Sequence, residues 1–182
     1  NINQYITHMD EVIQKQILSE EQCIDILDNA TGSWESSKVG PLNYESKERI
    51  SSEQTSIYDY GKLHELKEQF GIQELPMHYK LVRYEKGDVF KKHRDNGVGY
   101  SDRYKTLIIQ LSNSEDYKGG DLLIYNDIKE NESYIRANRD IGTCIMFASN
   151  ISHEVTPIEE GIRYSLVIWL SRDEMGDERS ML

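Results

Sequence analysis

The apolar residues in the first third of the chain recur at helical spacing. A capping box over residues 19–22 predicts that a helix begins there, because the side chains of Ser19 and Gln22 can each bond the other's backbone amide. The helix is expected to end at Gly32 and to bury one apolar face, made of Cys23, Ile24 and Leu27. A second helix is expected over 59–70, with an apolar stripe of Leu63, Leu66 and Phe70.

The segment between these helices, residues 33–56, is polar. It is rich in Ser, Glu and Lys and contains the dipeptide Gly40-Pro41. Because this composition is typical of loops, we expect an exposed loop here, with one strand near 55–58.

From Tyr79 onward the pattern changes to short apolar runs that are rich in β-branched and aromatic residues. Each run is bounded by Gly, Asn, Asp or Ser, as strands commonly are. The runs cover residues 79–84, 105–111, 121–125, 143–148 and 164–170. Because no helical pattern separates them, they predict an antiparallel sandwich, barrel or jelly roll. Gly119-Gly120-Asp121 is expected to form a turn that leads into a strand, since glycine adopts positive φ without cost.

The charge of the chain narrows the possible partners. The 182 residues include 21 Lys and Arg against 32 Asp and Glu, for a formal net charge of −11. This balance disfavours sequence-independent binding to nucleic-acid phosphates and to anionic membrane surfaces. No stretch approaches the roughly 18 apolar residues of a membrane-spanning helix.

Cysteine usage favours a reducing compartment. Cys23 and Cys144 are the only cysteines, too few for a disulfide framework or a four-thiolate metal site. No charged segment followed by an apolar run is visible at the start of the sequence, so we expect a cytoplasmic protein.

Two histidines precede an aspartate by two residues, in His8-Met9-Asp10 and His93-Arg94-Asp95. Since the chain holds 13 aspartates, such a pair is weak evidence alone. At the edge of a strand, however, residues i and i+2 face the same side, so His93 and Asp95 can direct a nitrogen and an oxygen to one point. The pair near the chain start has no surrounding strands, and we interpret it as solvated.

His153 is the candidate third ligand. It lies 58 residues beyond Asp95, after the predicted strand 143–148 and a short turn. Two histidines and one carboxylate form the facial triad of non-haem Fe(II) sites, which leaves coordination positions open. A closed structural zinc site would need a fourth ligand, and the sequence offers none nearby.

Arg163 and Ser165 are the candidate residues for an acidic ligand. As strand neighbours at i and i+2 they face the same way. An arginine in an apolar strand can pair with a carboxylate of the protein, or it can bind the carboxylate of a small acid, for which its planar fork is suited. The triad favours the second interpretation.

In this order, these residues resemble the Fe(II)/2-oxoglutarate-dependent oxygenases, most closely the prolyl 4-hydroxylase branch. The matching elements are His93-x-Asp95, Gly119-Gly120-Asp121-Leu122, His153-Glu154-Val155 and Arg163-x-Ser165, followed by Trp169. The resemblance implies a mainly β fold with N-terminal helices (α+β) and a double-stranded β-helix, or jelly-roll, core. It implies a single domain over 1–182, with a helical support and substrate-side loop over 1–78 and the catalytic core over 79–171.

The resemblance also implies roles for individual residues. It assigns His93, Asp95 and His153 as iron ligands and Arg163 as the partner of the 2-oxoglutarate C5 carboxylate. Five further residues are implied to surround the co-substrate: Ser165, Thr106, Tyr84, Gln110 and Trp169. The sequence departs from the branch at two of these positions, because collagen-type members commonly have Lys in place of Arg163 and other members have Tyr in place of Gln110. The co-substrate contacts are therefore expected to differ in detail.

The implied activity is hydroxylation of a prolyl residue in a peptide or protein, with decarboxylation of 2-oxoglutarate to succinate. The implied requirements are Fe(II), 2-oxoglutarate and O2, with ascorbate as reductant. Substrate choice is expected to lie in the segments 33–56 and 96–104. Three alternatives stay open: another side chain, free amino acid or small molecule as substrate; a non-catalytic jelly-roll binding module; and a zinc hydrolase, for which no general base is evident.

Overall fold

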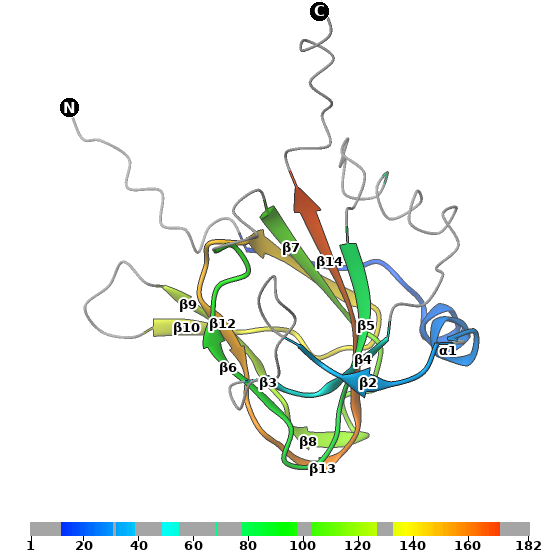
Figure 1. Ribbon diagram of the computed structural model, residues 1–182. Helices are drawn as coiled ribbons and strands as arrows, with labels where there is room; N and C mark the ends of the chain where they lie inside the picture. Colours follow the sequence, from blue (N-terminus) through cyan, green and yellow to red (C-terminus); the bar gives the residue numbers. More distant parts are fainter. Residues whose placement is uncertain are drawn as a thin grey trace, which may run out of the picture.

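Two antiparallel β-sheets face each other and enclose the centre of the protein (Figure 1). The computed structural model describes residues 12–30, 32–38, 49–54, 68, 78–97, 103–126 and 133–171. The seven-stranded sheet contains, in spatial order, β1 (Ile13–Gln16), β11 (Thr143–Ala148), β7 (Arg103–Gln110), β14 (Arg163–Ser171), β5 (His78–Tyr84), β4 (Ser52–Gln54) and β2 (Glu35–Ser36). The five-stranded sheet contains β10 (Ser133–Arg136), β9 (Leu122–Asn126), β12 (His153–Val155), β6 (Val89–His93) and β3 (Arg49–Ile50). A two-stranded ribbon pairs β13 (Ile158–Gly161) with β8 (Tyr117–Gly119).

The predicted strands are present. Each of the five lies within two residues of its expected bounds, and the strand over 143–148 has the predicted limits. The jelly-roll prediction is therefore confirmed. The apolar runs of the sequence form the strands, and their apolar side chains pack between the layers of the fold.

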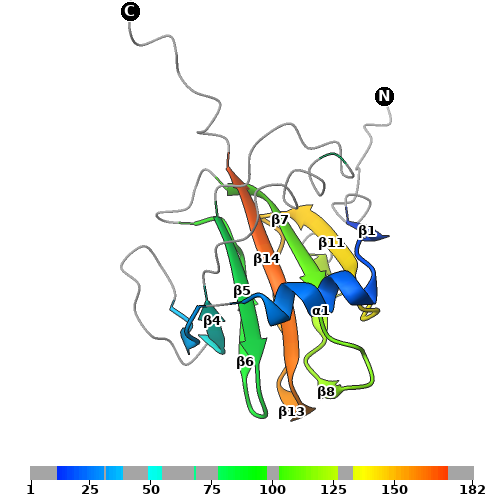
Figure 2. The same cartoon turned by 90° about the vertical axis from the view of Figure 1, so that its right-hand side faces the viewer.

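The central strands of the seven-stranded sheet, β11, β7 and β14, are mostly buried on both faces. On its outer face, Leu107 and Ile109 of β7 pack with Cys23 and Ile26 of helix α1 (Glu20–Asp28), which lies across the sheet (Figure 2). On its inner face, Ile108 packs against residues of the five-stranded sheet. Successive strand residues face opposite sides, so Thr106 and Gln110 share the inner face with Ile108.

Helix α1 begins as predicted and ends earlier than predicted. The capping box is present, with Gln22 N donating to Ser19 Oγ at 3.2 Å and Ser19 N donating to Gln22 Oε1 at 2.8 Å. The helix ends at Asp28 rather than Gly32, because Asn29 caps it through a side-chain bond to the Asp25 carbonyl oxygen. No helix in the described ranges has the length and apolar character to cross a bilayer.

The apolar face of α1 also differs from the prediction. Ile24 is 48% exposed, and Ile26 is buried in its place beside Cys23. The rotation of the helix about its axis determines which of its residues face the sheet. Periodicity over two turns does not set this rotation, so the sequence did not predict that Ile26 is buried in place of Ile24.

The prediction that 33–56 is one exposed loop is wrong for its described part. Strands β2 and β4 extend the edge of the seven-stranded sheet, and β3 pairs with β6. Ser37, Arg49 and Ser51 are buried there. Backbone pairing at the sheet edges holds these strands in place. Their residues are mostly polar, so the sequence shows no apolar periodicity that would predict a strand. The strand expected near 55–58 lies outside the described residues, as does the helix over 59–70 except for Glu68.

The predicted glycine turn is present between β8 and β9. Gly119 and Gly120 have φ values of 69° and 62°. A Cβ at Gly119 would collide with the carbonyl oxygen of Pro157, and one at Gly120 with Cδ1 of Ile158. Both conformation and space therefore require glycine here.

Candidate metal centre

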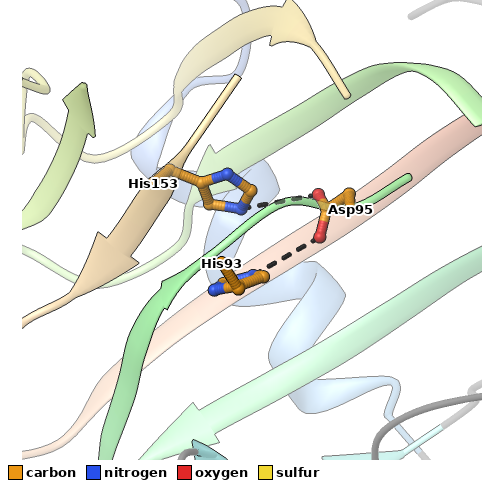
Figure 3. A group of neighbouring side chains, drawn as sticks. All are labelled: His93, Asp95 and His153. Atoms are coloured by element: carbon orange, nitrogen blue, oxygen red, sulfur yellow. Dashed lines mark ion pairs between the residues drawn. The ribbon is translucent and has the colours of Figure 1, made fainter. Parts of the chain in front are cut away.

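Three predicted ligands converge on one point between the sheets. His93 ends β6, Asp95 lies two residues beyond it, and His153 begins β12 directly opposite His93. Their ligand atoms lie within 4.8 Å of one another. Nε2 of His93 is 3.4 Å from Oδ1 of Asp95, and Nε2 of His153 is 3.5 Å from Oδ2 (Figure 3). His8 and Asp10, the other histidine–aspartate pair, lie outside the described residues.

Backbone carbonyl groups orient both imidazole rings. Nδ1 of His93 lies 2.7 Å from the Lys91 oxygen, and Nδ1 of His153 lies 3.0 Å from the Ile151 oxygen. When each Nδ1 carries the proton and donates to its carbonyl, each Nε2 keeps a lone pair that is available to a metal ion. Nε2 of His93 is buried without a hydrogen-bond partner among the described residues. The ring of Phe90 stacks on His93 with centroids 3.4 Å apart and limits its movement.

The protonation states match those of metal ligands. Burial lowers the pKa of His153 to about 4, although Asp95 acts in the opposite direction. Burial would raise the pKa of Asp95, but the attraction of His153 and His93 and the hydroxyl of Thr106 together hold it well below its usual range. Neutral imidazole and ionised carboxylate are the forms that bind metal.

This donor set fits Fe(II). Two imidazole nitrogens and one carboxylate oxygen form the facial triad, in which the protein leaves coordination positions to other molecules. Within the part of the chain that the structure describes, the cluster of potential ligands contains three residues and not the four of a closed zinc site.

A buried arginine lies on the inner face of the opposite sheet. Arg163 begins β14, is 1% exposed, and donates from Nη2 to Oε1 of Gln110 on β7 at 3.0 Å. Among the described residues, no carboxylate pairs with Arg163, and its buried Nε has no hydrogen-bond partner. Because a buried charge without a counter-charge is unfavourable, this position is suited to an anionic ligand.

The remaining predicted co-substrate residues lie on the same inner face. Ser165 is the strand partner of Gln110, and Tyr84 is the strand partner of Arg163, with its ring centroid 5.5 Å from the guanidinium carbon. Burial raises the pKa of Tyr84, so its hydroxyl stays protonated. Trp169 lies farther along β14, opposite Thr106.

The hydroxyl of Thr106, a residue expected beside the co-substrate, contacts a metal-ligand candidate. It donates to Oδ2 of Asp95 at 2.7 Å and lies 3.0 Å from Oγ of Ser149. Sequence reasoning missed Ser149, whose only signal was its place in the turn before His153.

Comparisons with known proteins agree with this geometry. Residues 79–171 match the family model described as "2OG-Fe(II) oxygenase superfamily". The chain is 32% identical over 108 residues to a PKHD-type hydroxylase of Acinetobacter baumannii (strain ACICU), a match that covers 55% of this chain and 46% of the relative. It is 31% identical over 119 residues to a PKHD-type hydroxylase of Shewanella baltica (strain OS155), covering 58% of this chain and 50% of the relative. The chain thus spans about half the length of these curated relatives.

Solved structures share the fold at low sequence identity. A Pseudomonas putida prolyl-4-hydroxylase superposes with a TM-score of 0.62 at 17% identity, covering 91% of this chain and 97% of that one. A Trichoplax adhaerens prolyl hydroxylase, in complex with a hypoxia inducible factor peptide fragment, has a TM-score of 0.63 at 19% identity and covers 94% of this chain and 86% of that one.

Proposed function

Because the chain belongs to the 2OG-Fe(II) oxygenase superfamily, we propose that it hydroxylates a prolyl residue of a peptide or protein. The reaction consumes 2-oxoglutarate and O2 and yields the hydroxylated residue, succinate and CO2. One oxygen atom of O2 enters the substrate C–H bond, and the other enters succinate. Ascorbate is the proposed reductant that keeps the iron in the Fe(II) state.

The observation that carries the proposal is the pairing of an open triad with a buried cation. His93, Asp95 and His153 offer three ligand atoms from one sheet. Arg163 offers from the other sheet a guanidinium that no carboxylate of the described residues pairs with. A dicarboxylate matches this arrangement, because one end can bind the metal held by the triad and the other can bind the Arg163 guanidinium.

The proposed role of the protein residues is to bind and orient the metal and the co-substrate and to shield them from water. When bound, Fe(II) would activate O2, the oxidant, and 2-oxoglutarate would supply two of the four electrons that O2 takes up, the substrate C–H bond supplying the other two. We assign His93, Asp95 and His153 as the residues that hold the metal, and Arg163 as the partner of the distal carboxylate. Gln110 holds the Arg163 guanidinium in place.

The other inner-face residues complete the proposed co-substrate site. Tyr84 and Ser165 lie beside Arg163 and Gln110, respectively, as their strand partners, and each carries a hydroxyl that can donate to a carboxylate. Trp169, 6% exposed, supplies an apolar wall farther along β14. Such a wall excludes water and strengthens the polar contacts within.

The segment 33–56 is the proposed substrate-side element, together with 96–104. Its strand β3 pairs with β6, and the guanidinium carbon of Arg49 lies 4.9 Å from the Phe90 ring centroid. Phe90 in turn stacks on His93. This segment therefore reaches the proposed metal site through two side chains. The prolyl hydroxylase neighbours, one in complex with a peptide, support a prolyl substrate in a peptide.

A peptide library tests the proposal. The chain is incubated with Fe(II), 2-oxoglutarate, O2 and ascorbate, and we expect succinate together with a mass gain of one oxygen atom on proline. His93→Ala and proline-free peptides serve as controls. If another side chain, a free amino acid or a small molecule gains the oxygen, the proposed prolyl substrate is wrong and the proposed oxygenase activity stands. Failure to form succinate, and no visible charge-transfer band after anaerobic addition of Fe(II) and 2-oxoglutarate, would contradict the activity and favour a non-catalytic binding module.

A further inference from the structure

Two buried hydroxyl groups form a chain that ends on Asp95. Thr106 and Ser149 are both 0% exposed. Building on the proposed metal site, we propose that Thr106 and Ser149 are positioning residues that fix the Asp95 carboxylate for metal binding. They act through Asp95 and do not themselves contact the metal.

The direction of the chain follows from the number of hydrogen atoms. Thr106 has one hydroxyl hydrogen and donates it to Oδ2 of Asp95 at 2.7 Å. In the 3.0 Å contact between the two hydroxyl oxygens, Ser149 must therefore be the donor. Each bond in a directed chain polarises the next, so Ser149 strengthens the bond from Thr106 to the carboxylate.

The backbone of Ser149 joins the two segments that carry the ligands. Its carbonyl oxygen accepts from the amides of Asp95 at 2.9 Å and Asn96 at 3.1 Å. Its own amide donates to the carbonyl of Tyr104 at 3.0 Å. The turn that contains Ser149 leads into β12 and His153. The loop carrying Asp95 is thus tied to the turn that precedes His153.

The hydroxyl of Thr106 has a function beyond packing. A charge-assisted bond to Oδ2 fixes the orientation of the carboxylate and occupies a lone pair of that oxygen. Each carboxylate oxygen faces one imidazole, Oδ1 at 3.4 Å and Oδ2 at 3.5 Å, but only Oδ2 accepts from Thr106, so Oδ1 is the oxygen that we assign to the metal. Partners that orient metal ligands in this way typically change metal affinity by about 10- to 100-fold when removed.

Mn(II) binding tests the inference without turnover. Free Mn(II) is measured by its electron paramagnetic resonance signal during titration of the metal-free protein. Thr106→Val keeps the branched shape and removes the hydroxyl, and we expect about 10- to 100-fold weaker binding. Thr106→Ser keeps the hydroxyl and is expected to restore wild-type affinity. Ser149→Ala keeps the backbone bonds and is expected to weaken binding less than Thr106→Val.

A second buried threonine provides the matched control. Thr143 is 2% exposed on β11, and its hydroxyl donates to Oε1 of Gln16 at 3.1 Å, away from the triad. Thr143→Val is expected to reduce thermal stability and leave Mn(II) affinity unchanged. Wild-type affinity in folded Thr106→Val and Ser149→Ala would overturn the inference while leaving the metal site in place. If Thr106→Val does not fold, the Mn(II) affinity of Ser149→Ala is compared with that of Thr143→Val, and equal affinities would overturn the inference. Absence of Mn(II) binding to the wild type would instead overturn the metal site, and with it the proposed function.

Discussion

Arg163 donates to Gln110 at 3.0 Å inside the barrel, and Gln110 donates in turn to the carbonyl of Asn138 at 3.2 Å. The carboxamide is neutral, so it orients the guanidinium without cancelling its charge. A tyrosine at this position, as in other members of the branch, could donate to the co-substrate directly. We propose that Gln110 instead acts on the co-substrate through Arg163, which would give the proposed anion site one main cationic donor.

Arg163→Ala is expected to raise the apparent KM for 2-oxoglutarate by about 10- to 100-fold. Hydrogen bonds to charged groups contribute roughly 1.5–3 kcal/mol each, which corresponds to this range. The measurement is succinate formation against 2-oxoglutarate concentration. Mn(II) affinity of the variant is the control and should match wild type. An unchanged KM would remove Arg163 from the co-substrate site.

Gln110→Glu is the companion variant to Arg163→Ala. It keeps the size of the side chain and places a carboxylate 3.0 Å from the guanidinium, where it would compete with the co-substrate. We expect a higher KM than in Gln110→Met, which removes the bond without adding charge. A lower KM in Gln110→Glu would show that the charge of Arg163 does not bind the co-substrate.

The two histidine–aspartate pairs are expected to differ in metal binding. His93→Ala or Asp95→Ala removes one of three ligand atoms that lie within 4.8 Å and should abolish Mn(II) binding in the titration described above. His8→Ala and Asp10→Ala are the matched controls, and both should bind as wild type. The reverse result would reassign the metal site to the chain start.

The strand series made much of the fold predictable, and the spacing of the three proposed ligands predicted that they would cluster. Runs such as 143–148 combine apolar residues with turn residues at both ends, so their limits can be read from composition. His93 and Asp95 face one side because of strand periodicity, and His153 follows another predicted strand. These signals are local, and tertiary packing preserves them.

Contacts between distant segments were not predictable. The bond from Thr106 to Asp95 depends on how β7 meets the loop after β6, and Ser149 joins through a third segment. Strand β2, Glu35–Ser36, is polar and exposed, and only its pairing with β4 makes it a strand. Such features come from neighbours that the local sequence does not specify.

Gly120→Ala is expected to destabilise the protein more than Gly87→Ala. Both glycines have positive φ, 62° and 89°, so each substitution costs about 1–2 kcal/mol of backbone strain. A Cβ at Gly87 meets open space, whereas one at Gly120 collides with Ile158 and lies 3.3 Å from Cδ of Arg163. Urea unfolding measures the difference, and equal losses would contradict the predicted collision.

Cys23 and Cys144 are expected to react slowly with iodoacetamide in the folded protein. Both are free thiols and 0% exposed, and burial raises the pKa of Cys23 to about 11 and that of Cys144 still further. The reactive thiolate is therefore scarce as well as inaccessible. Mass spectrometry in buffer and in urea compares the two states. The wild type should show the same stability under oxidising and reducing conditions, and a difference that Cys23→Ser and Cys144→Ser each abolish would reveal a disulfide.

The metal-free protein is expected to lose stability as the pH falls from about 6.5 to about 4. Burial lowers the pKa of His153 from its ordinary 6.5 to about 4, so in this window the unfolded chain takes up a proton that the folded chain does not. The stability contributed by the neutral His153 is fully present above pH 6.5, and about 3 kcal/mol of it is lost at the lower limit.

His153→Gln cannot take up this proton, so its free energy of unfolding should depend less on pH across the window. Carboxyl groups away from the triad act equally in both proteins, so the difference between the two curves reports His153 together with its effect on Asp95. Parallel curves would show that the imidazole is not buried in its neutral form, and would weaken its assignment as a preformed metal ligand.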